Sequence, residues 1–310
     1  MHGKLRYSKK LKKVTIMANT WQHIPILAVE IADLLLRNKS GHYLDGTLGL
    51  GGHTKLFLSR LDNEARILGL DKDSQAIKLA ESKVADSRLI TRQASYLKAP
   101  EILRELNWPL LDGALFDLGL SSYQLDDPTR GFSFLKSGPL DMRFDNTKGA
   151  TAADLVNTLP ADKLEYIFKT YGEERNAKKI ALAICNARRE TPFQTTTDLK
   201  ILIEKHIPRF GKTHQATRIF QALRIAVNEE LETVARAPKM LENIIKPGGR
   251  AAFLTFHSTE DRIIKQAFKE MENTGAWHLV NKKLIVPSPE EIKNNSRARS
   301  AGLRIIERVL

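Results

Sequence analysis

The sequence predicts a doubly wound, mostly parallel α/β sheet of the Rossmann-like type, interrupted by an all-helical insertion. Short apolar segments alternate with amphipathic helical segments in residues 23–122, and the alternation resumes in residues 214–310. Between them, residues 123–213 contain no convincing strand and show helical spacing of their apolar residues. We therefore expect a discontinuous sheet domain (23–122 and 214–310), a helical insertion (123–213) and a basic N-terminal arm (1–22).

A glycine-rich turn follows the first expected strand. Asp45 ends that strand and begins the spacing D-x-x-x-G-x-G, which places glycines at positions 49 and 51. Glycine allows positive φ and close approach of the backbone to a ligand, and the helix behind the turn offers free amides. The next strand ends in Asp71, about 20 residues further on, where Rossmann-type folds place an acid that binds ribose hydroxyls. A glycine turn alone is often only structural, but the two features together favour nucleotide binding.

The other elements follow from the same alternation, and Pro25 suits the first turn of the first helix. Expected strands cover residues 43–45, 66–70, 88–91, 113–116 and 251–256, with two more near 277–280 and 303–307; a turn at 246–249 precedes the fifth. Expected helices of the sheet domain cover residues 25–35, 53–61, 73–84, 100–106 and 219–227, and another begins near Thr259. Insertion helices are expected around 164–168, 177–184 and 199–203, the last capped by Thr197.

Polar residues stand at the ends of several expected strands. They are Asp45, Asp71, Asp117 and the pair His257 and Ser258. Ligand sites of open α/β sheets lie outside the carboxyl ends of the strands. Each residue alone could be a cap or a turn former, but together they predict one site at this edge of the sheet.

The composition favours a polyanionic partner. The chain has 310 residues and a formal charge of +13, with 49 Lys and Arg against 36 Asp and Glu. Nucleic acid is the first candidate and a membrane surface the second, while a soluble protein that is merely basic remains an alternative. Residues 1–13 carry six basic side chains and no acid, which fits an RNA-touching arm, a transit peptide or a solvated tail.

Several other classes of protein are disfavoured. Cys185 is the only cysteine, so the chain forms no internal disulfide and no thiolate cluster. The eight histidines lack ligand spacing, and we expect no metal. No apolar run approaches the roughly 18 residues of a membrane span and no signal peptide is evident, so we expect a cytoplasmic protein without a membrane partner.

Nine segments together resemble one known family, the bacterial 16S rRNA cytosine-N4 methyltransferases (RsmH or MraW type). They run in that family's order and cover nearly the whole chain from residue 23. Tyr96 stands where the family commonly has Phe, and Thr259 where Leu is common. The segments are residues 23–27, 45–53, 117–126, 130–134, 138–143, 171–175, 216–225, 257–262 and 295–300.

The resemblance implies an enzyme that transfers a methyl group from S-adenosylmethionine to the exocyclic N4 of a cytosine in the decoding centre of 16S rRNA, in the P-site region. Its partner would be that rRNA in the small ribosomal subunit, and a homodimer is left open. The helical insertion would recognise the RNA. The cofactor contacts expected from the motifs and the glycine turn are Asp45, Gly49, Gly51, Gly52, His53, Asp71, Tyr96, Asp117 and Gln124.

Methyl transfer from a sulfonium requires mainly that acceptor, methyl and sulfur are aligned. The amine of cytosine is a poor nucleophile, so a hydrogen-bond acceptor beside it would help. We expect Asp117 in this role, with Asp141, His257 and Ser258 as second choices. The basic residues expected to contact RNA are Arg143, Arg175, Arg218, Arg224, Arg297 and Arg299. The acidic patches 173–174 and 229–230 cannot face phosphate.

Three alternatives remain open at this stage. A methyltransferase of the same fold could act on another amine, in DNA or in protein. A non-catalytic ribosome-assembly factor would bind the cofactor without turnover. A dinucleotide-dependent dehydrogenase is disfavoured, because D-x-x-x-G-x-G replaces G-x-G-x-x-G and no partner for hydride transfer is evident.

Overall fold

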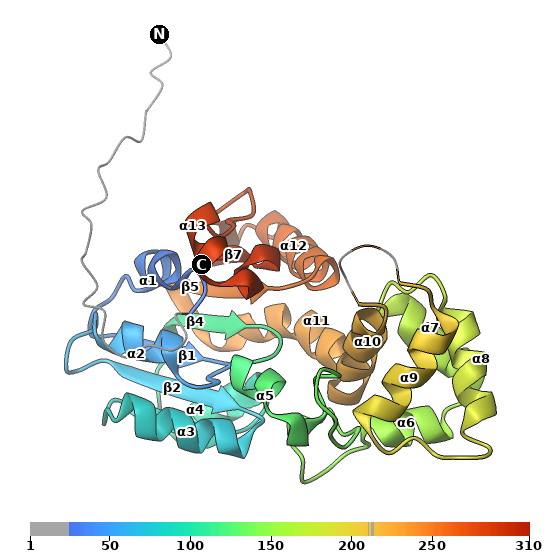
Figure 1. The fold of residues 1–310 in the computed structure, drawn as a ribbon. Coiled ribbons are helices and arrows are strands. Elements are labelled where there is room, and N and C mark those ends of the chain that lie inside the picture. Colours follow the sequence, from blue (N-terminus) through green and yellow to red (C-terminus); the bar gives the residue numbers. More distant parts are fainter. Residues whose placement is uncertain (1–24, 210, 212–213) are drawn as a thin grey trace.

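A computed structural model describes residues 25–209, 211 and 214–310. The expected basic arm and the first two residues of segment 23–27 lie outside this range. The described chain forms a sheet domain and, beside it, a bundle of helices (Figure 1). The two parts are connected by the long segment that follows β4 and by the helix pair α10 and α11.

The sheet has seven strands in the order β3-β2-β1-β4-β5-β7-β6. The five strands from β3 to β5 pair in parallel, and β7 pairs antiparallel with both β5 and β6. The predicted doubly wound, mostly parallel sheet is therefore confirmed. The strands are β1 (His42–Asp45), β2 (Arg66–Asp71), β3 (Leu89–Gln93), β4 (Leu111–Asp117), β5 (Ile245–Thr255), β6 (Trp277–Leu279) and β7 (Gly302–Arg308).

Both faces of the sheet are buried under helices, because successive strand side chains point to opposite faces and both sets are apolar. On one face, Leu44, Phe116 and Phe253 pack with α4, α11 and α12. On the other face, Tyr43 and Leu115 pack with α1 and α2. The helices of the sheet domain are α1 (Ala28–Leu35), α2 (Gly52–Leu58), α3 (Ser74–Val84), α4 (Ala99–Glu105), α11 (Glu230–Met240), α12 (Ser258–Asn273) and α13 (Pro289–Asn294).

The helical part has its own apolar core. The short helix α5 (Ser122–Asp126) leads into this part. Its helices are α6 (Ala152–Thr158), α7 (Ala161–Thr170), α8 (Ala177–Ala187), α9 (Thr196–His206) and α10 (Ala216–Asn228). Ile219, Phe220 and Leu223 of α10 belong to this core. The expected boundary at residue 213 would place α10 in the sheet domain. Its apolar stripe packs instead against α6, α7 and α9, so α10 belongs to the helical core.

Some local expectations were wrong. The first helix begins at Ala28, because Leu27 adopts a left-handed conformation (φ 51°) that no helix continues through, so Pro25 precedes the helix. Helix α9 is capped by Thr195 instead of Thr197: the Thr195 hydroxyl accepts from the amide of Asp198, whose carboxylate accepts from the amide of Thr195.

Two further differences concern the end of the sheet domain. β5 begins before the glycines at 248 and 249, because Ile245 already pairs with Leu111 ahead of a register shift. Helix α13 was not expected. No helix in the described part of the chain is both long and apolar enough to span a membrane.

Candidate active site

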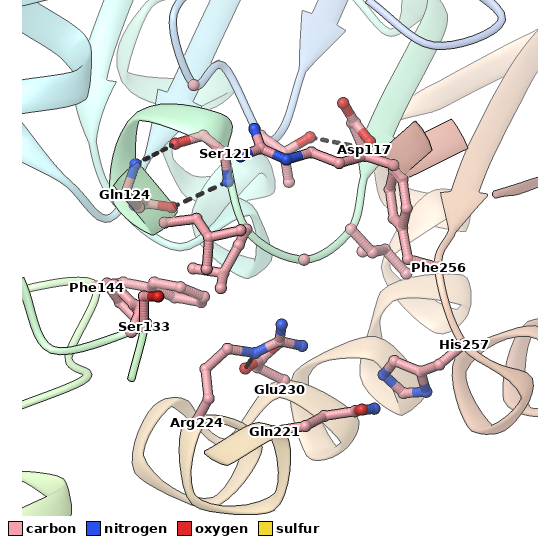
Figure 2. A pocket seen from close by; sticks show the side chains of 18 of the residues that line it. Asp117, Ser121, Gln124, Ser133, Phe144, Gln221, Arg224, Glu230, Phe256 and His257 are labelled. Carbon is pink, nitrogen blue, oxygen red and sulfur yellow. Dashed lines mark hydrogen bonds and ion pairs between the residues drawn. The ribbon is translucent and has the colours of Figure 1, made fainter. Parts of the chain in front are cut away.

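A cavity of about 1180 Å³ lies between the sheet domain and the helical part. The segments that follow all five parallel strands line one side of it: Gly46–Leu50, Asp71–Lys72, Ala94–Tyr96, Asp117–Ser121 and Phe256–His257. The loop that precedes α6 and one face of α10 line the other side (Figure 2). Of the polar residues expected to meet at this edge of the sheet, Asp71, Asp117 and His257 line the cavity, whereas Asp45 and Ser258 do not.

The turn after β1 shapes the first wall. Gly49 has φ 51° and lines the cavity, and a Cβ there would meet nothing closer than 3.8 Å. Gly51 has φ 75°, but its Cα faces α3, where an added Cβ would lie 2.6 Å from Val84 Cγ2. Asp45 is buried below the turn and accepts hydrogen bonds from the Thr54 hydroxyl (2.7 Å) and the Thr47 amide (3.3 Å). Gly51 and Asp45 therefore shape the turn from behind, unlike the expected contacts Gly49, Gly52 and His53, which line the cavity.

Asp71 at the end of β2 is half-buried and held in a fixed orientation. Its two carboxylate oxygens accept from the amides of Gly49 (2.8 Å) and Asp73 (2.9 Å). Burial raises the pKa of Asp71 to about 6, although both amides act in the opposite direction. The carboxylate thus ties the glycine turn to β2 and still borders the cavity.

Asp117 and His53 face each other at the ends of β4 and of the glycine turn. Asp117 Oδ2 lies 3.5 Å from His53 Nε2. Asp117 Oδ1 and both ring nitrogens of His53 are buried and have no hydrogen-bond partner among the described residues. Buried polar atoms are nearly always satisfied in folded proteins, so these atoms mark a place that a polar ligand completes.

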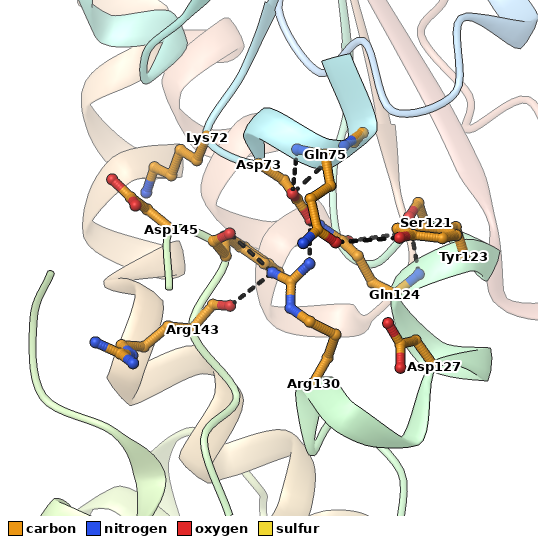
Figure 3. A network of polar contacts seen from close by, with 12 residues as sticks. Lys72, Asp73, Gln75, Ser121, Tyr123, Gln124, Asp127, Arg130, Arg143 and Asp145 are labelled. Carbon is orange, nitrogen blue, oxygen red and sulfur yellow. Dashed lines mark hydrogen bonds and ion pairs between the residues drawn. The ribbon is translucent and has the colours of Figure 1, made fainter. Parts of the chain in front are cut away.

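A buried polar network holds the cavity wall beside α5 (Figure 3). Arg130 donates to Asp73 Oδ2 (2.5 Å) and to the carbonyl oxygens of Arg143 and Phe144. Gln124, an expected cofactor contact, donates to the same Asp73 oxygen (3.1 Å) and accepts from the amide of Ser121. The network therefore joins the end of β2 to the loop that enters the helical part.

The opposite wall carries an ion pair. Arg224 Nε and one Nη donate to the two oxygens of Glu230 at 2.7 and 3.0 Å. Burial lowers the pKa of Arg224, but Glu230 raises it by more, so the net pKa of Arg224 lies above its ordinary value. His257 Nε2 lies 3.0 Å from Glu260 Oε1. Burial raises the pKa of Glu260, yet His257 and the amide of Phe256 lower it by more, to a net value below the usual range.

The structure separates the candidate catalytic residues. Asp117 and His257 line the cavity, whereas Asp141 and Ser258 do not. The carboxylate of Asp141 is occupied by Arg143, which donates from Nε (2.9 Å) and Nη2 (2.8 Å). Ser258 is exposed and donates to Glu173 Oε1 (3.1 Å). Because both side chains lie outside the cavity, Asp141 and Ser258 reach no ligand within it. Their contacts with Arg143 and Glu173 hold loops in place instead.

The candidate RNA-binding arginines differ in their surroundings. Arg224 lies inside the cavity, and Arg143 is paired with Asp141, so neither presents the open cation expected. Arg297 lines the cavity rim, donates to Asp126 (2.9 Å) and has a second Nη that is buried without a partner among the described residues. The exposed members are Arg175, Arg218 and Arg299.

Among the residues of the cavity wall that sequence reasoning missed are Phe144, Gln221, Glu230 and Glu260. Gln221 and Arg224 are three residues apart and share a polar face of α10, a spacing that is visible in the sequence. Glu230 was expected only to avoid phosphate, and the loop position of Phe144 carries no periodic signal.

The parallel sheet, the glycine turn after β1, the acid after β2 and the cavity at the strand ends define a Rossmann-like S-adenosylmethionine-dependent methyltransferase. Residues 20–309 match the model of the MraW methylase family, and the chain belongs to that family. The predicted family is thereby confirmed.

Curated relatives are similar over nearly their whole length. The chain is 55% identical over 292 residues to ribosomal RNA small subunit methyltransferase H of Elusimicrobium minutum, covering 94% of this chain and 100% of that protein. It is 43% identical over 311 residues to the protein of the same name from Magnetococcus marinus, covering 94% and 99%. Among solved structures, the chain has a weak similarity to Aeropyrum pernix fibrillarin with bound S-adenosylmethionine. The two are 12% identical, the match covers 90% of this chain and 73% of that chain, and the TM-score is 0.38.

Proposed function

We propose that this chain transfers a methyl group from S-adenosylmethionine to the exocyclic N4 of a cytosine in the decoding centre of 16S rRNA, and that the small ribosomal subunit in the cytoplasm is its substrate. The observation that carries the proposal is the unsatisfied carboxylate oxygen of Asp117 in a cavity shared by the sheet domain and the helical part. The names of the relatives support RNA of the small subunit as the substrate class.

The residues of the sheet side fit S-adenosylmethionine. Gly49 leaves open space where a side chain would stand, and the half-buried acid Asp71 suits ribose hydroxyls. Tyr96 lines the cavity, packs edge-on against Phe116 and offers an aromatic ring for adenine. Gln124 and His53 complete the wall. When bound, the cofactor supplies a methyl group that is already activated on a sulfonium.

Asp117 holds the acceptor amine in our proposal. Its free Oδ1 accepts a hydrogen bond from the N4 amine, which orients the amine lone pair and draws the proton that becomes acidic as the new bond forms. His53, 3.5 Å from the other oxygen, keeps the carboxylate turned towards the cavity. The segment after Asp117 contains Gly119 with φ 99°, which bends the backbone round the acceptor position.

The helical part is proposed to position the RNA. The cavity lies between the sheet domain and the helical part, so the target base must leave its stack to enter it, at a cost of a few kcal/mol. Arg297 at the rim has a free buried Nη that suits a phosphate beside the extruded base. Arg175, Arg218 and Arg299 are exposed and suit further phosphates.

The test is methylation of small subunits from a strain that lacks the corresponding gene. The full-length enzyme and S-adenosylmethionine should add one methyl group to N4 of a cytosine, read by mass spectrometry of the digested RNA. A methyl group on ring carbon 5, on a ribose 2′-oxygen or on no cytosine would refute the proposal. Binding without any turnover would favour an assembly factor instead.

The role of Asp117 is tested separately. Asp117→Ala should lower kcat by at least about tenfold at saturating cofactor, because a charge-assisted hydrogen bond is worth about 1.5–3 kcal/mol. Cofactor affinity is measured by calorimetry, so that a binding defect is not mistaken for a catalytic one. Ser258→Ala is the matched control, because Ser258 stands at a strand end but outside the cavity, and its kcat should stay unchanged.

A further inference from the structure

The cavity is larger than one ligand needs. Ligand pockets usually measure about 300–1,000 Å³, and this cavity measures about 1180 Å³. The residues that fit the cofactor occupy the sheet side. The remaining space is bordered by Phe144 and Phe256 on opposite sides and by Gln221, Arg224 and His257 from below (Figure 2). A second, flat ligand therefore fits next to the cofactor position.

Arg224 faces this space with unused donors. A guanidinium has five N–H groups, and two of those of Arg224 are engaged by Glu230. No other partner of the guanidinium is found among the described residues, and its second Nη points to the open part of the cavity (Figure 2). The side chains of Arg224 and Glu230 are only 15% and 7% exposed, so donors directed at a ligand here are not weakened by bulk water.

The charges exclude a phosphate at this place. Glu230 neutralises Arg224, and Glu260 adds a second buried carboxylate nearby, with Arg224 contributing to its lowered pKa. An anion would meet the carboxylates of Glu230 and Glu260, while the cations beside them, Arg224 and Lys72, are already opposed by these acids and by Glu229. A neutral ring with hydrogen-bond acceptors on one edge fits better, and the aromatic side chains that flank the space can stack on its faces.

We propose that the Arg224–Glu230 pair recognises the Watson–Crick edge of the target cytosine: Arg224 donates to ring nitrogen N3 and to the O2 carbonyl, and Glu230 fixes the guanidinium in the plane of the base. This inference rests on the proposed function. It leaves the N4 amine for Asp117. It also explains rejection of uracil, since the N3–H of uracil would oppose an N–H of Arg224.

The experiment is a cycle of enzyme variant and base analogue. Small subunits are reconstituted with either cytidine or 3-deazacytidine at the nucleotide that the wild-type enzyme methylates, and kcat/KM is measured for both. The analogue replaces the N3 acceptor by C–H and keeps the amine. The wild-type enzyme should lose about tenfold or more, the value of a hydrogen bond from a charged donor.

The informative variant is Arg224→Gln combined with Glu230→Gln, which leaves no unpaired buried charge. Its penalty for the analogue should fall below about threefold, because the partner of N3 is gone. Arg224→Lys is the second variant: it keeps the charge and loses the planar fork, and its penalty should fall likewise. Calorimetry gives the cofactor affinity of each variant, so that activities are compared at saturating cofactor, because Glu230 also acts electrostatically on Tyr96 and Lys72 of the cofactor side.

The matched control is Arg250→Gln combined with Glu307→Gln. This pair has a similar exposure, 16% and 24%, but lies outside the cavity. It should retain the full tenfold penalty. An equal penalty in the wild type and the Arg224 variants, or no penalty in the wild type, would overturn the inference while methylation of cytosine upholds the proposed function. Absence of cytosine methylation by the wild type would overturn both.

Discussion

Replacing Arg130 by Met should destabilise the protein strongly. Arg130 and Asp73 are only 5% and 3% exposed in their side chains, and three donor contacts of Arg130 disappear together: one to Asp73 and two to the carbonyl oxygens of Arg143 and Phe144. Removing one partner of a buried ion pair costs about 3–5 kcal/mol, because the other charge stays buried. Among the described residues, Asp73 then retains only Gln124 and the first amides of α3 as partners.

The measurement is equilibrium urea unfolding followed by circular dichroism. Arg143→Met is the matched control, because Arg143 likewise pairs with an aspartate, Asp141. These two side chains are more exposed, at 18% and 22%, so we expect the free energy of unfolding to fall by at most about 1 kcal/mol. Adding Asp73→Asn to Arg130→Met should recover part of the free energy of unfolding. A loss for Arg130→Met below 1 kcal/mol, or equal to that of the control, would refute the reasoning.

Two further predictions concern the glycine turn and its neighbouring acid. Because the pKa of Asp71 is about 6, its carboxyl group is mostly protonated below pH 6 in the free protein, and the cofactor affinity measured by calorimetry should fall about tenfold from pH 7 to pH 5. The Asp71→Asn variant should bind the cofactor more weakly at pH 7 and lose this pH dependence. A wild-type affinity that is flat over this range would argue against a ribose contact. Gly51→Ala should lower the free energy of unfolding by about 1–3 kcal/mol, because the φ of Gly51 is 75° and the new Cβ would lie 2.6 Å from Val84. The kcat at saturating cofactor should stay unchanged, and Val84→Ala in the same chain should recover part of the lost stability. An unchanged stability of Gly51→Ala would contradict the packing argument.

The sheet could be predicted because its signals are local. Each parallel strand is a short apolar run, and the polar residue that ends it, such as Asp71 or Asp117, is adjacent in sequence. Parallel order then brings these ends to one edge without further information. The first wall of the cavity therefore followed from strand ends alone.

The second wall depends on contacts that no local pattern records. Arg224 was expected to contact RNA, but the turn between α10 and α11, where Glu229 adopts φ 51°, places Glu230 against it. Asp141 looked like a free acid, yet its side chain pairs with Arg143 two residues later. Such pairings are decided by tertiary geometry, and sequence spacing alone does not reveal them.

The long detour between β4 and β5 also determines the order in which the chain can fold. These central strands pair in parallel, but residues 118–244 separate them, so closing the sheet directly would carry a large loop-closure entropy. Asn228 donates to the carbonyl of Met142 and accepts from the amide of Phe144, which clips the two ends of the detour together. If residues 118–244 fold on their own core first, they bring β5 close to β4 before the two strands pair. During synthesis the folded helical part then lowers the entropy cost of pairing β5 with β4.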